Sequence, residues 1–182
     1  MPKLGEPEYS MSEPPIHPSN LPEEQLWAEC RTRRLRRSGP GGQHRNKVET
    51  AVVLHHQPTG VTAEANERRS QSQNRAVALH RLRINLALEY RISRDSTTIP
   101  SALWRSRCAK SGQISINPTH DDFPAVLAET LDVIVANDFD LPHAANLLQC
   151  TASQLVKLLK KEPRALALVN RRRRELKLHP LR

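Results

Sequence analysis

The chain has 182 residues, which is enough for one medium-sized domain or two small ones. Lys and Arg outnumber Asp and Glu by 28 to 19, which gives a formal net charge of +9 and indicates a polyanionic partner, either a nucleic acid or an anionic membrane surface. No stretch approaches the roughly 20 apolar residues that a membrane-spanning helix requires, so a transmembrane protein is excluded.

The N-terminal residues predict a flexible leader over residues 1–21. The first 20 residues contain five prolines and no apolar periodicity. Glutamates outnumber the single Lys3 in this region, which argues against a secretory signal or an Arg-rich transit peptide. We therefore expect a cytoplasmic location.

Residues 22–94 predict a small α+β domain with a short sheet and one long helix. Pro58, Thr59 and Gly60 supply a turn between two β-branched, apolar runs, which indicates a hairpin. The expected elements are a helix over 22–30, strands over 31–37, 50–57 and 61–65, and a long helix over 70–93.

The long helix is predicted from its ends and its apolar periodicity. Ser70 followed by Gln73 has the spacing of a capping box at its start. Apolar residues at three- and four-residue steps form a stripe along the helix, which is expected to pack on the sheet. Four arginines lie mostly outside this stripe and are expected to face solvent or phosphate. The stripe is Leu79, Leu82, Leu86 and Tyr90, and the arginines are Arg75, Arg81, Arg83 and Arg91.

The second half of the chain predicts a linker over 95–120 and an all-α bundle over 121–182. The linker is polar and is interrupted by two prolines and a glycine. The helices are expected over 121–137, with Phe123, Leu127, Leu131 and Ile134 on one stripe, and over 142–149, 151–160 and 163–178. The short turn near Cys150 and Thr151 resembles that of a helix-turn-helix.

Charge is divided sharply within this half. Residues 118–141 hold six acids and no Lys or Arg, whereas residues 157–182 hold ten Lys and Arg against two acids. The basic end is either a solvated face of a helical bundle or a second RNA-docking surface. We favour RNA docking by the run Arg171, Arg172, Arg173 and Arg174, because four consecutive arginines are hard to neutralise locally.

The cysteines and histidines predict no metal site and no cofactor. Cys30, Cys108 and Cys150 are far apart and form no Cys-x-x-Cys pair. His55 and His56 are adjacent in an expected strand, so their side chains point to opposite faces and cannot chelate one metal together. We expect structural or surface roles for these residues.

The segment Gly41-Gly42-Gln43 is the main candidate for chemistry. Two glycines allow close approach of the backbone to a bulky partner, and the neutral amide of Gln43 can orient water without titrating. An ordinary glycine turn is the alternative. The surrounding charge favours an active site completed by RNA, because residues 31–47 hold seven cations and no acid. The cations are Arg31, Arg33, Arg34, Arg36, Arg37, Arg45 and Lys47.

The sequence from Arg37 to Arg83 resembles the catalytic, GGQ-containing domain of class I peptide chain release factors. The matching elements are Ser38–His44, Asn46-Lys47, Pro58-Thr59-Gly60, Arg69-Ser70-Gln71 and Asn74-Arg75-Ala76. The resemblance covers about the first half of the chain and implies the same α+β architecture.

The resemblance implies hydrolysis of the ester that joins a peptide to tRNA in the ribosomal peptidyl site. Gly41, Gly42 and Gln43 would enter the peptidyl transferase centre, where the Gln43 backbone N–H would donate to the developing oxyanion. No protein general base is evident near this tip. The candidates for RNA contacts are Arg37, His44, Arg45, Lys47, Arg69, Arg75 and the run Arg171–Arg174. A glutamine methyltransferase acting on Gln43 is a possible further partner.

The departures from the release-factor pattern predict independence from stop codons. Factors that read stop codons carry a decoding domain and an N-terminal helical domain, neither of which fits before Arg37. The chain is therefore similar to the branch that rescues stalled ribosomes, and we expect a monomer acting on a whole ribosome or a split large subunit. The alternatives are a helix-turn-helix nucleic-acid-binding module with a non-catalytic glycine loop and, less favoured, a hydrolase of free peptidyl-tRNA.

Overall fold

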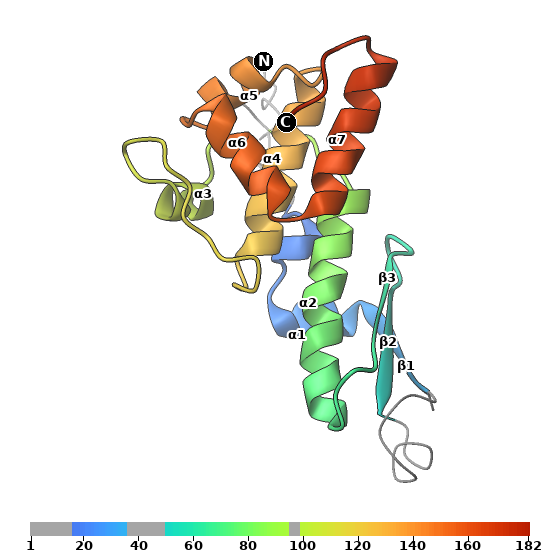
Figure 1. Cartoon of the computed structure of the whole chain (residues 1–182). Coiled ribbons are helices and arrows are strands. Elements are labelled where there is room, and N and C mark those ends of the chain that lie inside the picture. Colours follow the sequence, from blue (N-terminus) through green and yellow to red (C-terminus); the bar gives the residue numbers. More distant parts are fainter. Residues whose placement is uncertain (1–15, 36–49, 95–98) are drawn as a thin grey trace, which may run out of the picture.

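A small antiparallel sheet packs on one long helix, and a bundle of helices follows (Figure 1). The computed structural model describes residues 16–35, 50–94 and 99–182. The strands are β1 (Cys30–Leu35), β2 (Ala51–His56) and β3 (Thr62–Ala65), in the spatial order β1-β2-β3. The helices are η1 (Pro18–Asn20), α1 (Glu23–Ala28), α2 (Gln71–Glu89), α3 (Ala102–Arg107), α4 (Phe123–Ala136), α5 (Leu141–Leu147), α6 (Ala152–Lys160) and α7 (Pro163–Glu175). The α+β fold expected from the sequence is confirmed.

The sheet turns one face toward α2, as alternation along β2 requires. Val52 and Leu54 are buried against that helix, and His55 on the other face is exposed. Leu79, Leu82 and Leu86 of α2 complete this core, so the predicted stripe is confirmed at these three positions.

Both ends of α2 differ from the prediction. Ser70 is the N-cap, but its side chain makes no capping bond, and its hydroxyl contacts the Ser72 hydroxyl at 2.7 Å instead. Tyr90 is not part of the stripe, because the helix ends at Glu89 and Tyr90 turns into extended backbone with 39% of its surface exposed. The capping box and the fourth residue of the stripe were therefore wrong.

The C-terminal helices surround α4. Phe123, Leu127, Leu131 and Ile134 are all at most 1% exposed, so the stripe predicted for this helix is confirmed. Helices α5 and α6 are joined by a short turn, and the Thr151 hydroxyl caps α6 by accepting a hydrogen bond from the Gln154 backbone N–H at 3.2 Å.

Helix α2 belongs to two hydrophobic cores at once. It gives Leu82 and Leu86 to the core beneath the sheet, and Ile84, Ala87 and Leu88 to the core around α4. Because a single rigid helix enters both cores, the sheet and the C-terminal bundle are mechanically connected through it (Figure 1).

Two stretches predicted to lack structure contain packed residues. Within the leader, His17, Ser19 and Leu21 are buried against the rest of the fold. Within the linker, α3 places Trp104 in the helical core, where its indole N–H donates to the Leu148 carbonyl at 2.8 Å. None of the helices in the described ranges is long and apolar enough to cross a bilayer.

Candidate functional site at the sheet end of α2

The predicted catalytic segment is held between two paired strand ends. Leu35, the last residue of β1, pairs with Ala51, the first residue of β2. The intervening residues 36–49 lie outside the described residues. They include Gly41, Gly42 and Gln43 and the predicted RNA contacts Arg37, His44, Arg45 and Lys47. The roles of these seven residues therefore stay predictions.

Asn74 ties the start of β2 to the first turns of α2. Its side chain is fully buried, and its amide nitrogen donates to the carbonyls of Thr50, at 2.7 Å, and Arg68, at 2.9 Å. Its amide oxygen accepts from the Arg68 backbone N–H at 2.9 Å. Thr50 directly follows the undescribed segment, so Asn74 fixes where that segment re-enters the fold. This role of Asn74 was not predicted from the sequence. A polar residue on the core face of an amphipathic helix could have indicated it, because a buried polar group needs hydrogen-bond partners.

Arg75 and Arg69 expose positive charge at the same end of α2. The Arg75 guanidinium carbon lies 4.0 Å from the centroid of the Trp27 ring, a cation–π arrangement. The Trp27 indole N–H in turn donates to Glu23 at 3.1 Å. Arg69 is exposed and has no hydrogen-bond or ion-pair partner among the residues that the structure describes. The two arginines remain suited to contact phosphate.

Strand β1 adds cations beside this end of the helix. It is an edge strand with Arg31, Arg33 and Arg34 all exposed. Arg31 and Arg33 are opposite His55 and Val53 of β2, on the face turned away from α2. The sheet therefore presents charge on its outer face, next to the strand ends that flank the glycine segment.

Comparison with known families identifies this domain. Residues 24–117 match the model of the RF-1 domain, which is about half of the chain and includes Gly41, Gly42 and Gln43. The chain belongs to the RF-1 domain family. The matched range starts in α1 and ends ahead of α4, so α4–α7 follow the RF-1 domain.

Two curated relatives show the extent of the similarity. Peptide chain release factor 2 of Variovorax paradoxus (strain S110) is 51% identical over 59 residues, which cover 32% of this chain and 16% of that protein. Peptide chain release factor 1 of Xylella fastidiosa (strain 9a5c) is 34% identical over 131 residues, or 72% of this chain and 35% of that protein. The chain thus spans at most about a third of the length of these relatives. No solved structure matches the chain.

The other predicted surface arginines of α2 are used inside the RF-1 domain. Arg83 donates to the carbonyls of Ser19, at 2.8 Å, and Leu21, at 2.7 Å, and so fastens the N-terminal segment to the helix. Arg81 forms an ion pair with Glu67 at 2.6 Å. The expectation that these arginines face solvent or phosphate is met at Arg75 and Arg81, which are exposed, whereas Arg83 is partly buried; a contact with phosphate is proposed only for Arg75.

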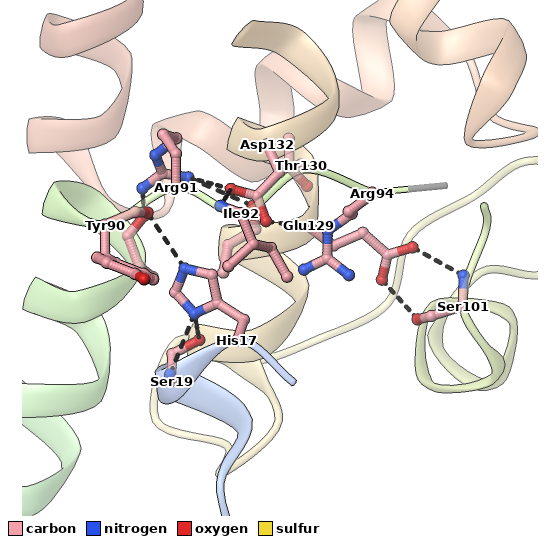
Figure 2. Close-up of polar contacts among 12 residues, drawn as sticks. His17, Ser19, Tyr90, Arg91, Ile92, Arg94, Ser101, Glu129, Thr130 and Asp132 are labelled. Carbon is pink, nitrogen blue, oxygen red and sulfur yellow. Dashed lines mark hydrogen bonds and ion pairs between the residues drawn. The ribbon is translucent and has the colours of Figure 1, made fainter. Parts of the chain in front are cut away.

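A buried ion pair joins the RF-1 domain to α4 (Figure 2). The Asp132 carboxylate is 1% exposed and accepts from Arg91 and Arg94, each at 2.9 Å. On the preceding turn of α4, the carboxylate of Glu129 accepts from the Ser101 backbone N–H at 2.7 Å and from the Ser101 hydroxyl at 2.5 Å. These two acids of the stretch 118–141 are internal, so they are not part of an acidic surface.

His17 completes the junction on its N-terminal side. Its Nε2 donates to the Tyr90 carbonyl at 3.1 Å, and its Nδ1 accepts from the Ser19 backbone N–H at 3.1 Å (Figure 2). The pKa of His17 is lowered from 6.5 to about 4, mainly by burial; the hydrogen bond to the Tyr90 carbonyl opposes this shift, and the nearby charges of Arg91 and Arg94 add to it. This imidazole is therefore neutral at neutral pH.

The Arg171–Arg174 run does not form a single cluster. Arg172 forms an ion pair with Glu175 at 2.5 Å. Arg173 donates from Nε to the His179 carbonyl at 2.8 Å and from Nη1 to the Phe139 carbonyl. Arg171 and Arg174 are exposed and, among the described residues, have no partner. Within the described part of the chain, only Arg172 is thus neutralised by an acid and Arg173 is fixed by carbonyls, so the expectation that the whole run cannot be neutralised locally is met, and its contact with RNA stays a prediction.

Burial keeps the cysteine thiols protonated and therefore unreactive. Burial raises the pKa of Cys30 to about 11 and that of Cys150 to about 12, so neither forms an appreciable thiolate at neutral pH. In residues 16–35, 50–94 and 99–182, no three His, Cys, Asp or Glu side chains are placed to hold a metal ion.

Proposed function

We propose that this chain hydrolyses the ester bond of peptidyl-tRNA on the ribosome, with Gly41, Gly42 and Gln43 in the peptidyl transferase centre. The observation that carries the proposal is the RF-1 match over residues 24–117, which spans this motif and the elements on both sides of it. The motif falls between strand ends that are held by register pairing and by Asn74.

The proposed chemistry needs little from protein side chains. Water is the nucleophile, the Gln43 backbone N–H donates to the developing oxyanion, and the Gln43 amide positions the water. Loss of one such preorganised donor typically lowers the rate by about 10²–10³. A Cβ at Gly41 or Gly42 would obstruct the close approach to RNA. Hydroxyl groups of RNA and tRNA would carry the proton.

Phosphate contacts at the sheet end of α2 would orient the domain. Arg69 and Arg75 are exposed there and are proposed to contact ribosomal RNA together with Arg37, His44, Arg45 and Lys47. Arg is well suited to this role because its planar guanidinium can donate two parallel hydrogen bonds to one phosphate.

We further propose that release is independent of a stop codon. Support comes from α6 and α7, which follow the RF-1 domain, because their exposed Lys and Arg side chains offer contacts to RNA backbone, which carries no codon information. The proposal places a monomeric protein on the ribosome in the cytoplasm, with a glutamine methyltransferase as a further partner through Gln43.

Peptide release from purified ribosomes tests both statements. Ribosomes with peptidyl-tRNA in the peptidyl site would carry a stop codon, a sense codon or a truncated message. We expect release on the truncated message, little dependence on the stop codon, and a loss of about 10²-fold or more in Gly42→Ala and Gln43→Ala.

Gly60→Ala is the matched control for Gly42→Ala. Gly60 has φ of +75°, with open space around its Cβ position, so the substitution strains a turn of the same domain without touching the motif. It should retain release. Release at stop codons alone would contradict codon independence. No release from ribosomes or from split large subunits would overturn the proposed hydrolysis and leave the helix-turn-helix binding module.

A further inference from the structure

A cationic cleft lies among the C-terminal helices, outside the RF-1 domain. Its volume is about 390 Å³, and it is bounded by α5, α6, the end of α7 and the residues after α7. This volume lies within the range of roughly 300–1,000 Å³ that is common for ligand-binding pockets. Apolar side chains form part of the lining, the polar lining residues are Ser153, Lys157, Lys160, Arg173 and Arg182, and none of the lining residues is acidic.

Helix α6 supplies one wall of the cleft. Ser153, Lys157 and Lys160 are spaced four and three residues apart, so they lie on one face of the helix, and all three are exposed. The opposite face, with Leu155, Leu158 and Leu159, is buried in the core. Neither lysine has a hydrogen-bond or ion-pair partner in the described part of the chain, so their charges are uncompensated.

The facing wall is held in place by hydrogen bonds. Arg173 is anchored through the carbonyls of His179 and Phe139, which leaves its remaining N–H groups free to donate. The Asn170 side chain accepts from the Leu181 N–H at 2.6 Å and donates to the Leu181 carbonyl at 3.1 Å. These bonds fold residues 179–182 back along α7 and place Arg173 and Arg182 in the cleft with the two lysines.

We propose that this cleft binds the phosphodiester backbone of single-stranded RNA. Four cationic side chains and no Asp or Glu side chain line the cleft, which matches a chain of phosphates, and the apolar side chains of the lining can pack against a ribose. A duplex fits less well, because a helix that reads a major groove needs free space on both sides, whereas the exposed face of α6 is flanked by the start of α5 and by Leu181 and Arg182. The choice of RNA over DNA rests on the proposed function; the match to phosphate does not.

Binding of a labelled oligonucleotide to the full chain tests the proposal. The probe is a fluorescein-labelled oligouridylate of about 12 nucleotides, followed by fluorescence anisotropy at several salt concentrations. The double variant Lys157→Ala, Lys160→Ala should weaken binding by about 10-fold or more. It should also reduce the slope of log K against log salt by about 1.4, since each lost phosphate contact on a single strand contributes about 0.7.

The matched control removes the same charge outside the cleft. Arg105→Ala, Lys110→Ala deletes two exposed cations that are not in the lining, and it should weaken binding by less than about 2-fold. An equal loss in both double variants would overturn the proposal and indicate a diffuse basic surface. No measurable binding by the unaltered protein would also overturn it.

A third variant separates charge in the cleft from folding. Ser153→Glu places an acid at the second position of α6, where the helix dipole favours negative charge. Its thermal midpoint should therefore match that of the unaltered protein while RNA binding falls about 10-fold. Retained binding in this variant would contradict the proposal.

Two further measurements distinguish single-strand binding in the cleft from duplex binding and from the proposed hydrolysis. Tighter binding of duplex DNA than of the oligouridylate would overturn single-strand binding in favour of a helix-turn-helix reader. Gly60→Ala should leave oligonucleotide binding unchanged, because Gly60 lies in the turn of the sheet and is not among the residues that line the cleft. A protein that binds the oligonucleotide through the cleft but releases no peptide would overturn the proposed hydrolysis alone.

Discussion

The two ends of α2 place similar arginines in opposite environments. At the N-terminal end, Arg75 stays exposed over the Trp27 ring. Just beyond the C-terminal end, Arg91 lies against the buried carboxylate of Asp132. The difference is set by the neighbours that the fold supplies. A run of cations in a sequence therefore does not by itself define a surface, and the charges available to a partner emerge only after the internal ion pairs are known.

The largest effect is expected at the C-terminal end, from Asp132→Ala. Removal of this carboxylate leaves Arg91 and Arg94 partly buried without their anion, and breaking a buried pair in this way costs about 3–5 kcal/mol. The free energy of unfolding, measured with urea, should fall by about 3 kcal/mol. Glu89→Gln, an exposed charge change at the C-terminal end of α2, is the control and should have little effect. Equal stability of the two variants would show that the junction is not stabilised by this pair.

The next effect is expected at the N-terminal end, from Asn74→Ala. The substitution leaves the partly buried Thr50 carbonyl and the Arg68 backbone without these partners, at about 2 kcal/mol of unfolding free energy. Asn85→Ala is the matched control, since it removes a half-buried amide of the same helix whose two hydrogen bonds, to the Thr62 carbonyl and from Arg164, are both solvent-accessible. It should cost less than about 1 kcal/mol. If the proposed function holds, Asn74→Ala should also slow peptide release in the surviving folded protein.

Protonation of His17 is expected to make the stability of the junction between the RF-1 domain and α4 depend on pH. Because the folded-state pKa of His17 is lowered to about 4, the folded state favours the neutral ring, and its stabilisation is complete above the unfolded value of 6.5. It is lost as the pH falls from there toward about 4, since only the unfolded chain then takes up the proton. Between about pH 7 and pH 5 the loss should be about 2 kcal/mol. In His17→Gln, the free energy of unfolding measured with urea should change less between pH 7 and pH 5 than it does in the unaltered protein. An equal change in both proteins would refute the lowered pKa of His17.

The smallest effect is expected from Arg75→Ala. The cation–π contact with Trp27 is exposed, and such contacts contribute about 0.5–1 kcal/mol. Arg69→Ala is the control, because this exposed neighbour has no partner in the described residues and its loss should leave stability unchanged. Urea unfolding followed by fluorescence distinguishes the two. An equal shift in both variants would indicate a general charge effect in place of the ring contact.

The local sequence pattern was enough to predict the elements whose own residues show a turn motif or an apolar periodicity. Turn chemistry at Pro58–Gly60 and the stripe of α4 predicted a hairpin and a helix that the structure contains. Prediction failed where the partner is distant in sequence. Trp104 in a polar stretch and His17 in a proline-rich one are buried against residues far along the chain, and their ring N–H groups donate to the carbonyls of Leu148 and Tyr90. No local rule anticipates such contacts.

In the candidate site, too, features set by the local sequence were predicted, and features that depend on distant residues were not. The glycine-glycine-glutamine motif was recognisable from the sequence because its chemistry is local, and the RF-1 match covers it. The support for that motif was not recognisable, since Asn74 acts through Thr50, 24 residues away. In the Arg171–Arg174 run, charge counting could not foresee that Arg173 is anchored to the carbonyls of His179 and Phe139.

The position of the two tryptophans makes the coupling through α2 visible to spectroscopy. The chain has two tryptophans, and Trp27 packs on the sheet core whereas Trp104 is buried in the helical core. A Trp27→Phe variant and a Trp104→Phe variant would each leave one fluorophore that reports on one core. Superimposable unfolding curves from the two variants would mean that the shared helix makes the protein melt as a single cooperative unit. Separated curves would resolve two folding units, each with its own emission signal.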